Sequence, residues 1–379
     1  MLSIVCRFPR CTKIDHSLKP PKGYNIIIYK SKQIYILIDI LVANNNIAYL
    51  FFFGSLLNFE RINRYICVLI FRPMNRKQFM QVAATSLLAV GAEGVHAKVF
   101  DSQAESVGEP ADEGIAVRFL GTGAADWNGK DERGEHRRLS SILIDGHILM
   151  DFTRTNLEML PEGCHPDTVF YTHSHGDHYH PATALKAGVK RVYLSQTWYD
   201  IAKNDFQRAA NELQAPMPEI IPLYVGQAVH IGDLAITPLP ASHATGYAFE
   251  QTLIYLLEKG GARLIYATDT GGIPAVAARL AGIDAHDRAG KPITALIMEA
   301  TMGMDYDDDF RVFTHTSVGG VERIVRVLEK TKRYAPPAGQ PVYLTHMART
   351  LHPTQKELDA TLPAPLAAAY DGLEVVFKA

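Results

Sequence analysis

The chain has 379 residues, enough for one large domain or two average ones, and its 47% hydrophobic and 21% charged residues are typical of a globular protein. The net charge of −2 hides an asymmetry, because residues 1–97 carry 12 basic and 4 acidic side chains. The totals of 38 and 40 leave 26 basic and 36 acidic side chains for residues 98–379, a net of −10. Such an acidic region repels phosphate backbones, which excludes bulk nucleic acid as the expected partner.

Residues 1–73 are rich in Ile, Tyr, Asn, Lys and Phe, whereas the remainder is rich in Ala, Gly, Pro and Leu. The apolar run from Ile34 to Leu57 has the length of a membrane helix, but Asp39 and three asparagines at 44–46 interrupt it. We therefore expect residues 1–73 to be a mis-assigned upstream extension of the reading frame. The alternative is a disordered or membrane-like segment, a true anchor followed by an Ala-rich linker.

A signal peptide is predicted at residues 74–97. Arg76 and Lys77 form a positive start, residues 82–91 form a short apolar stretch, and Val95 and Ala97 precede a cleavage site before Lys98. The start resembles a twin-arginine export signal with a lysine in the second position, and the general secretory route is the alternative. We expect a protein exported from a bacterial cytoplasm, periplasmic or extracellular, with residues 98–379 as one domain.

From residue 115 the sequence alternates between apolar runs and turn signals, and Asp145-Gly146 predicts a hairpin. Strands are predicted within residues 115–123, 140–152, 167–173, 190–195, 234–243, 252–270, 295–301 and 341–347. Helical periodicity covers residues 197–214, 272–283, 317–334 and 353–362. Strands mixed with helices, with polar residues at several strand ends, predict an α/β (α+β) layered fold.

Four histidines and an aspartate fall within eight residues of the stretch "YTHSHGDHYHP", which follows a predicted strand. In such a loop His173 and His175 can converge on one ion, and Gly176 is expected to provide the bend that turns Asp177 and His178 toward a second. A merely solvated loop is the alternative, and His180 has no assigned role. Residues 98–379 contain only one cysteine, so any metal there needs histidine and carboxylate ligands.

Suitable partners occur at three later strand ends. His243, Asp269 and His346 each come just after an apolar run, where the chain reaches the edge of a sheet. This pattern resembles the metallo-β-lactamase fold superfamily over most of residues 115–350. The resemblance implies a four-layer αββα sandwich and two divalent metal ions, expected to be zinc, with manganese or iron as alternatives. It also implies the ligands of each metal: His173, His175 and His243 for one, Asp177, His178 and His346 for the other, and Asp269 bridging both.

Further segments resemble one branch of the superfamily. Aspartate at 269, where β-lactamases usually have cysteine, is similar to the phosphodiesterase, glyoxalase and lactonase branches. "MEAT" and "FTHTS" resemble two segments of the tRNA 3′-processing endonucleases (RNase Z) and the cyclic phosphodiesterase branch. This implies that Glu299 and His315 act as orienter and general acid, beside Asp177 as a catalytic ligand. The long tRNA-gripping arm is missing, since only 25 residues separate His243 from Asp269.

The function expected is therefore an exported dinuclear metal-dependent hydrolase, with a small anionic molecule as its substrate. It would cleave a small phosphodiester or cyclic phosphate through a hydroxide that bridges the two metals. A lactonase or other ester hydrolase is the alternative, and β-lactam hydrolysis is less favoured because of Asp269. A non-catalytic metal-binding scaffold is the alternative from a different class. An oligomer is compatible with the sequence.

Overall fold

The computed structural model describes residues 25–30, 34–43, 46–55, 68–70, 114–284 and 290–379, and the chain divides into two compact units, residues 1–105 and 106–379. In the first unit four antiparallel strands pair in chain order: β1 (Asn25–Lys30), β2 (Ile34–Ala43), β3 (Asn46–Ser55) and β4 (Val68–Ile70). The apolar run considered as a membrane helix thus forms β2 and β3. Among the described residues, no helix has both the length and the apolar character to cross a membrane. The predicted signal peptide lies outside the described residues.

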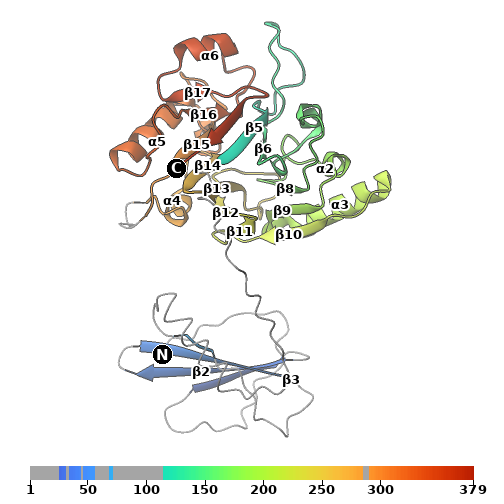
Figure 1. Ribbon diagram of the computed structural model, residues 1–379, viewed down its shortest axis with the longest axis vertical. Coiled ribbons are helices and arrows are strands. Elements are labelled where there is room, and N and C mark those ends of the chain that lie inside the picture. The colour runs from blue at the N-terminus through green and yellow to red at the C-terminus, as the bar shows by residue number, and fades with distance from the viewer. Residues whose placement is uncertain (1–24, 31–33, 44–45, 56–67, 71–113, 285–289) are drawn as a thin grey trace, which may run out of the picture. The chain divides into compact units, whose positions relative to one another are not determined.

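The second unit contains two mixed seven-stranded sheets (Figure 1). The first has the order β10-β9-β8-β7-β6-β5-β18, with strands β5 (Ile115–Gly121), β6 (Ser141–Ile144), β7 (Ile148–Met150), β8 (Thr168–Phe170), β9 (Arg191–Ser195), β10 (Glu219–Leu223) and β18 (Glu374–Phe377). The second runs in chain order, with β11 (Val229–Ile231), β12 (Leu234–Pro240), β13 (Leu253–Lys259), β14 (Ala262–Ala267), β15 (Ala295–Glu299), β16 (Val342–Thr345) and β17 (Leu366–Ala368).

Helices cover the outer face of each sheet (Figure 1). The first sheet packs against α2 (Pro181–Ala187) and α3 (Tyr199–Leu213). The second packs against α4 (Ala275–Leu280), α5 (Val318–Lys330) and α6 (Gln355–Thr361). Three short 3-10 helices complete the unit: η1 (Arg154–Met159), η2 (Gln196–Trp198) and η3 (Phe310–Phe313). The predicted four-layer αββα sandwich is confirmed.

Strand β14 shows why the sequence forms this arrangement. Its side chains alternate, so that Leu264 and Tyr266 face the core between the two sheets, while Ile265 and Ala267 face the helical layer. A strand buried on both faces reads as a continuous apolar run rather than as an alternating one. The predicted hairpin also forms between β6 and β7, where Asp145 and Gly146, at φ 48° and 74°, are the central residues of a turn closed by the His147 amide on the Ile144 carbonyl at 3.1 Å.

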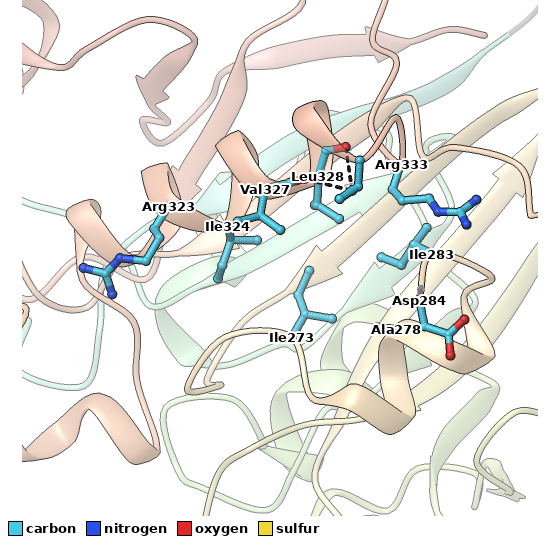
Figure 2. Close-up of a pocket in the computed structure, with 10 residues that line it drawn as sticks. Ile273, Ala278, Ile283, Asp284, Arg323, Ile324, Val327, Leu328 and Arg333 are labelled. Atoms are coloured by element: carbon cyan, nitrogen blue, oxygen red, sulfur yellow. Dashed lines mark hydrogen bonds between the residues drawn. The ribbon is translucent and has the colours of Figure 1, made fainter. Parts of the chain in front are cut away.

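A groove of about 420 Å³ lies between α4 and α5 in the outer layer (Figure 2). Its wall includes Ile273, Ile324 and Val327, and none of the predicted site residues lines it. The residues predicted from the sequence to bind metal lie instead at one edge of the sandwich. Strands β12, β14, β15 and β16 run in one direction, so their carboxyl ends, which precede the candidate ligands, share an edge of the second sheet.

Candidate metal centre

The histidine-rich segment follows β8 and turns back immediately. The amides of His178 and Tyr179 both donate to the carbonyl of His175, at 3.0 and 2.9 Å. The expectation that this bend depends on Gly176 is wrong, because its φ lies outside the left-handed region and a Cβ there would meet nothing within 4 Å. The turn is fixed instead by these hydrogen bonds.

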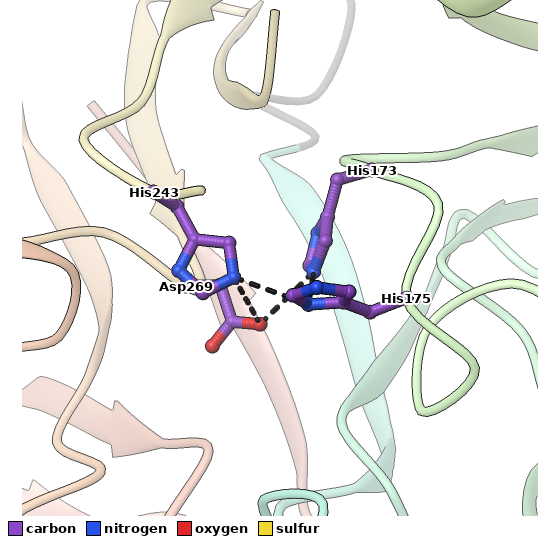
Figure 3. Close-up of side chains that lie close together, drawn as sticks. All are labelled: His173, His175, His243 and Asp269. Atoms are coloured by element: carbon purple, nitrogen blue, oxygen red, sulfur yellow. Dashed lines mark hydrogen bonds and ion pairs between the residues drawn. The ribbon is translucent and has the colours of Figure 1, made fainter. Parts of the chain in front are cut away.

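The first cluster contains His173, His175, His243 and Asp269, whose donor atoms all lie within 4.8 Å of one another (Figure 3). Asp269 Oδ2 is 3.1 Å from His173 Nε2 and 3.6 Å from His243 Nε2. His243 Nε2 is in turn 3.2 Å from His175 Nδ1. The first sheet contributes two of these histidines and the second sheet contributes the third, together with the aspartate.

The second cluster contains Asp177, His178, Asp269 and His346, again within 4.8 Å. Asp269 Oδ2 is 3.0 Å from His178 Nε2, and His346 Nε2 is 3.5 Å from Asp177 Oδ2. All seven predicted ligands therefore come together, and Asp269 is common to both clusters, as a bridging ligand must be. That these residues bind metal remains a prediction.

The hydrogen bonds around the rings show which nitrogens are free to coordinate. His243 Nδ1 lies 3.1 Å from the carbonyl oxygen of Thr314, which can only accept, so Nδ1 carries the proton and Nε2 presents a lone pair. His178 Nδ1 likewise donates to Asp151 Oδ2 at 2.7 Å. Thr301 Oγ1 donates to Glu299 Oε2 and therefore accepts from His346 Nδ1, which lies 2.9 Å away. His346 Nε2, 3.2 Å from that of His178, then faces another lone pair.

Two facing lone pairs repel unless a cation or a proton lies between them. The donor set is imidazole nitrogen and carboxylate oxygen without thiolate, which suits zinc, manganese or iron. Asp269 Oδ1 is buried, and its neighbours are two imidazole nitrogens, His346 Nδ1 at 3.1 Å and His315 Nδ1 at 3.4 Å. The residues present therefore fit divalent metal ions.

For Asp269 and His173 the electrostatics favour the protonation states that metal ligands need, whereas at His178 burial is outweighed by Asp177, Asp151 and Asp269, which raise its pKa well above its usual value in the absence of a metal ion. Burial raises the pKa of the Asp269 carboxyl, but His346, His178 and His173 outweigh it and hold that pKa well below its usual value. For His173, burial and the neighbouring His178 lower the pKa to about 3 despite its contact with Asp269. Asp269 is thus an anion and His173 is neutral.

Asp151, which the sequence analysis did not assign, fixes the orientation of His178. It is fully buried, directly follows β7, and accepts from the Thr172 amide at 2.8 Å and from His178 Nδ1 at 2.7 Å. A carboxylate behind a ligand histidine sets the tautomer and increases the basicity of the coordinating nitrogen. The available signal was the one used for Asp269, a polar residue directly after an apolar run.

We predict that Asp151→Asn lowers metal affinity about 10- to 100-fold, because the imidazole of His178 loses its anionic partner. Asparagine tolerates the left-handed backbone at this position, where φ is 54°, so the fold is retained. The measurement is competition for zinc with a chelating dye. Asp145→Asn, a change of the same type at φ 48° in the β6–β7 turn, is the matched control. Equal affinities of the two variants would contradict the assigned role.

Glu299 and His315 are in contact, as the resemblance implied. Glu299 ends β15, is fully buried and accepts from the amide of Thr270. Its Oε2 lies 3.3 Å from His315 Nδ1, which is also 3.4 Å from Asp269 Oδ1. Burial opposes protonation of His315, but the bonds to Asp269 and Glu299 prevail and raise its pKa to about 10. Their catalytic role remains a prediction.

His180 is the histidine of the cluster that lies outside both groups. It is the N-cap of α2, where its Nδ1 lies 2.8 Å from Thr183 Oγ1 and accepts from the Thr183 amide at 3.2 Å. Arg154 Nε donates to its other nitrogen at 2.7 Å. Its role in the structure is therefore to begin a helix.

A four-layer αββα sandwich with a histidine–aspartate centre at one edge of its sheets defines the metallo-β-lactamase fold. Residues 142–347, more than half of the chain, match the family model of the β-lactamase superfamily domain, and the chain belongs to this family. Its members bind divalent metals and are mostly metal-dependent hydrolases.

The comparison with solved structures finds similar chains at low sequence identity. Zinc-bound PqqB from Methylobacterium extorquens is 17% identical with a TM-score of 0.50, over 69% of this chain and 99% of that one. The metallo-β-lactamase fold protein YhfI from Bacillus subtilis is 16% identical with a TM-score of 0.49, over the same shares. A long-form RNase Z from yeast is 13% identical with a TM-score of 0.46, over 87% of this chain and 50% of that one. Comparison with curated proteins gives no match.

Proposed function

We propose that the protein is a dinuclear metal-dependent phosphodiesterase that cleaves a small phosphodiester or cyclic phosphate. The observation that carries the proposal is the position of the His315–Glu299 pair. His315 Nδ1 lies 3.4 Å from Asp269, the residue that the two metal clusters share. A phosphodiester needs both a cationic clamp on its oxygens and a proton for its leaving group, and this arrangement offers both.

Two ions would be held by the two clusters, one by His173, His175 and His243 and the other by Asp177, His178 and His346, with Asp269 in contact with both. Such ions supply Lewis acidity and make water nucleophilic near neutral pH. Zinc is the metal we expect, while manganese and iron suit the same donors.

The protein's own residues would handle the protons. Asp177 is partly accessible, and its Oδ2 lies 3.3 Å from His178 Nε2, which places a carboxylate where it can accept a proton from the attacking water. At His315, Nδ1 is held by Glu299 at 3.3 Å, which leaves Nε2 as the nitrogen that can donate to the departing oxygen. Glu299 itself is fixed by Thr270 and Thr301, so it holds the imidazole in one orientation.

The substrate class follows from size and charge. The 25 residues between His243 and Asp269 include β13 and β14, whose hairpin fills this connection and leaves no inserted arm for a large substrate. The net charge of −10 on residues 98–379 also opposes a polyanion. A small anion remains favoured, because the cationic centre can neutralise a single phosphodiester.

The test is an activity screen of the full chain loaded with zinc, manganese or iron. We expect bis(p-nitrophenyl) phosphate to be hydrolysed in preference to lactones and β-lactams, with about two equivalents of metal bound. Preferential turnover of lactones would instead establish the ester-hydrolase alternative. Fewer than one bound equivalent, together with no turnover of any substrate, would favour a non-catalytic metal-binding scaffold.

A further inference from the structure

Exposed apolar side chains gather in two segments that border the candidate centre, residues 244–251 and 304–314, here called the rim segments. They contain six of the 14 large apolar side chains exposed in the described part of the chain, including every exposed phenylalanine. Phe310 and Phe313 are 81% and 77% exposed, Phe249 is 57% and Tyr247 is 41% exposed. Apolar surface this concentrated marks a binding surface rather than chance exposure.

The rim segments are joined to the centre through their ends. The first begins directly after His243 and the second ends directly before His315. Ser242 Oγ donates to the carbonyl of Phe313 at 2.9 Å, and His243 Nδ1 donates to that of Thr314 at 3.1 Å. The same hydrogen bond that orients a predicted metal ligand therefore fixes the backbone beside Phe313, while the ring of Phe313 faces solvent.

The second rim segment presents its two phenylalanines together. Phe310 and Phe313 are the first and last residues of η3, and residues three apart in a 3-10 helix lie on the same side. Its cation is already paired, since Arg311 Nη2 lies 2.8 Å from Asp309 Oδ2. The exposed side chains of this segment are therefore the apolar ones of Met304, Phe310, Val312 and Phe313 and the carboxylates of Asp305 and Asp308.

The first rim segment is held by Glu250, whose carboxylate accepts from the amide of Ser174 at 2.8 Å, from its hydroxyl at 2.6 Å and from Thr245 Oγ1 at 2.7 Å. Ser174 lies between His173 and His175 in the sequence, so Glu250 ties the segment to the predicted ligands. Beyond this tie, the rings of Tyr247 and Phe249 lie 5.5 Å apart at 31° and form a joint aromatic surface.

From this arrangement we infer that Tyr247, Phe249, Phe310 and Phe313 bind an apolar group of the substrate, an alkyl, acyl or aryl substituent attached to the anionic group that the centre holds. The substrate class is thereby an amphiphilic phosphodiester rather than a wholly polar one. The identity of the anionic group rests on the proposed function, whereas the apolar recognition rests on the rim segments alone. Hydrogen bonds hold the rim segments in place, and a preformed apolar surface binds a ligand with a smaller loss of conformational entropy than a surface that must first become ordered.

The test measures binding and not turnover. The metal-loaded full chain is titrated calorimetrically with dimethylphosphinate, methyl(butyl)phosphinate and methyl(octyl)phosphinate, which carry the single charge of a phosphodiester but no hydrolysable ester bond. We expect affinity to rise about twofold per added methylene over the first several carbons, as half-burial of each group implies. The double variant Phe310→Ala/Phe313→Ala should bind the octyl compound about tenfold more weakly and show a flattened series.

Val327→Ala is the matched control, because it removes a 53% exposed apolar side chain from the outer groove of Figure 2 and should keep the full chain-length dependence. Thermal unfolding confirms that each variant is folded. A flat series with the unaltered protein, or a dependence that the phenylalanine variant retains, would overturn the inference.

Two further results would assign the surface to a different binding partner. A dimer in sedimentation that the phenylalanine variant dissociates, with a flat phosphinate series, would assign the surface to a second copy of the chain and overturn the inference. Binding to phosphatidylcholine vesicles with a flat series would assign it to a lipid surface, with the same consequence. Failure to hydrolyse phosphodiesters, with the chain-length dependence retained, would remove the proposed function and the phosphodiester as substrate, and would leave the binding of an apolar group by the rim segments standing.

Discussion

Asp269→Asn is expected to reduce the bound metal from about two equivalents to fewer than one and to lower hydrolysis by about a thousandfold. The carboxylate oxygen Oδ2 lies 3.1 Å from His173 Nε2 and 3.0 Å from His178 Nε2, so one residue serves both clusters. Asparagine keeps the shape of the side chain and tolerates the left-handed backbone, where φ is 46°, but it removes the charge. The measurements are elemental analysis after dialysis and turnover of bis(p-nitrophenyl) phosphate.

The control for this variant is again Asp145→Asn, at φ 48° in the β6–β7 turn. It should retain full metal content and activity, because Asp145 pairs with Lys259 and lies outside both clusters. Two equivalents of metal in Asp269→Asn would show that Asp269 does not bridge the two clusters.

His315→Ala is expected to affect substrates according to their leaving groups. For an alkoxide leaving group kcat/KM should fall about 10²- to 10⁴-fold, because the general acid is lost. For p-nitrophenolate, which departs without protonation, the loss should be much smaller. A series of aryl and alkyl methyl phosphates measures this as a steeper dependence of rate on leaving-group pKa, a readout that a purely structural role would not change.

Glu299→Gln should show the same dependence on the leaving group with a smaller loss of kcat/KM. Glu299 Oε2 lies 3.3 Å from His315 Nδ1 and orients the imidazole, but it does not itself donate the proton. His230→Ala, which removes an exposed histidine outside the clusters, should leave the whole series unchanged. An equal loss for every leaving group in His315→Ala would rule out proton donation by this residue.

The strands and the candidate site were largely predictable from the sequence because their signals are local. Buried strands such as β14 are short apolar runs, and their ends are visible as the first polar residue. Asp269 and His346 were found in this way. The turn at Asp145 and Gly146 was equally local, since its geometry needs residues that accept positive φ.

What the sequence did not reveal depends on distant contacts. Strand β18 pairs with β5, so that Glu374 lies opposite Arg118, and no local pattern encodes this partner. Helix α2 has seven residues, and its N-cap is His180, which is not among the usual N-cap residues. In the first unit, the run that forms β2 and β3 was long enough for a helix, and apolar length alone does not distinguish the two.

The division of the candidate ligands between the two sheets has a consequence for assembly. His173 and His178 follow β8 of the first sheet, whereas Asp269 and His346 follow β14 and β16 of the second. Neither half of the sandwich offers a complete donor set, so a cation held here would act as a cross-link between the halves and add its binding free energy to folding. Only a chain whose two sheets have packed together would therefore bind the metal with full affinity.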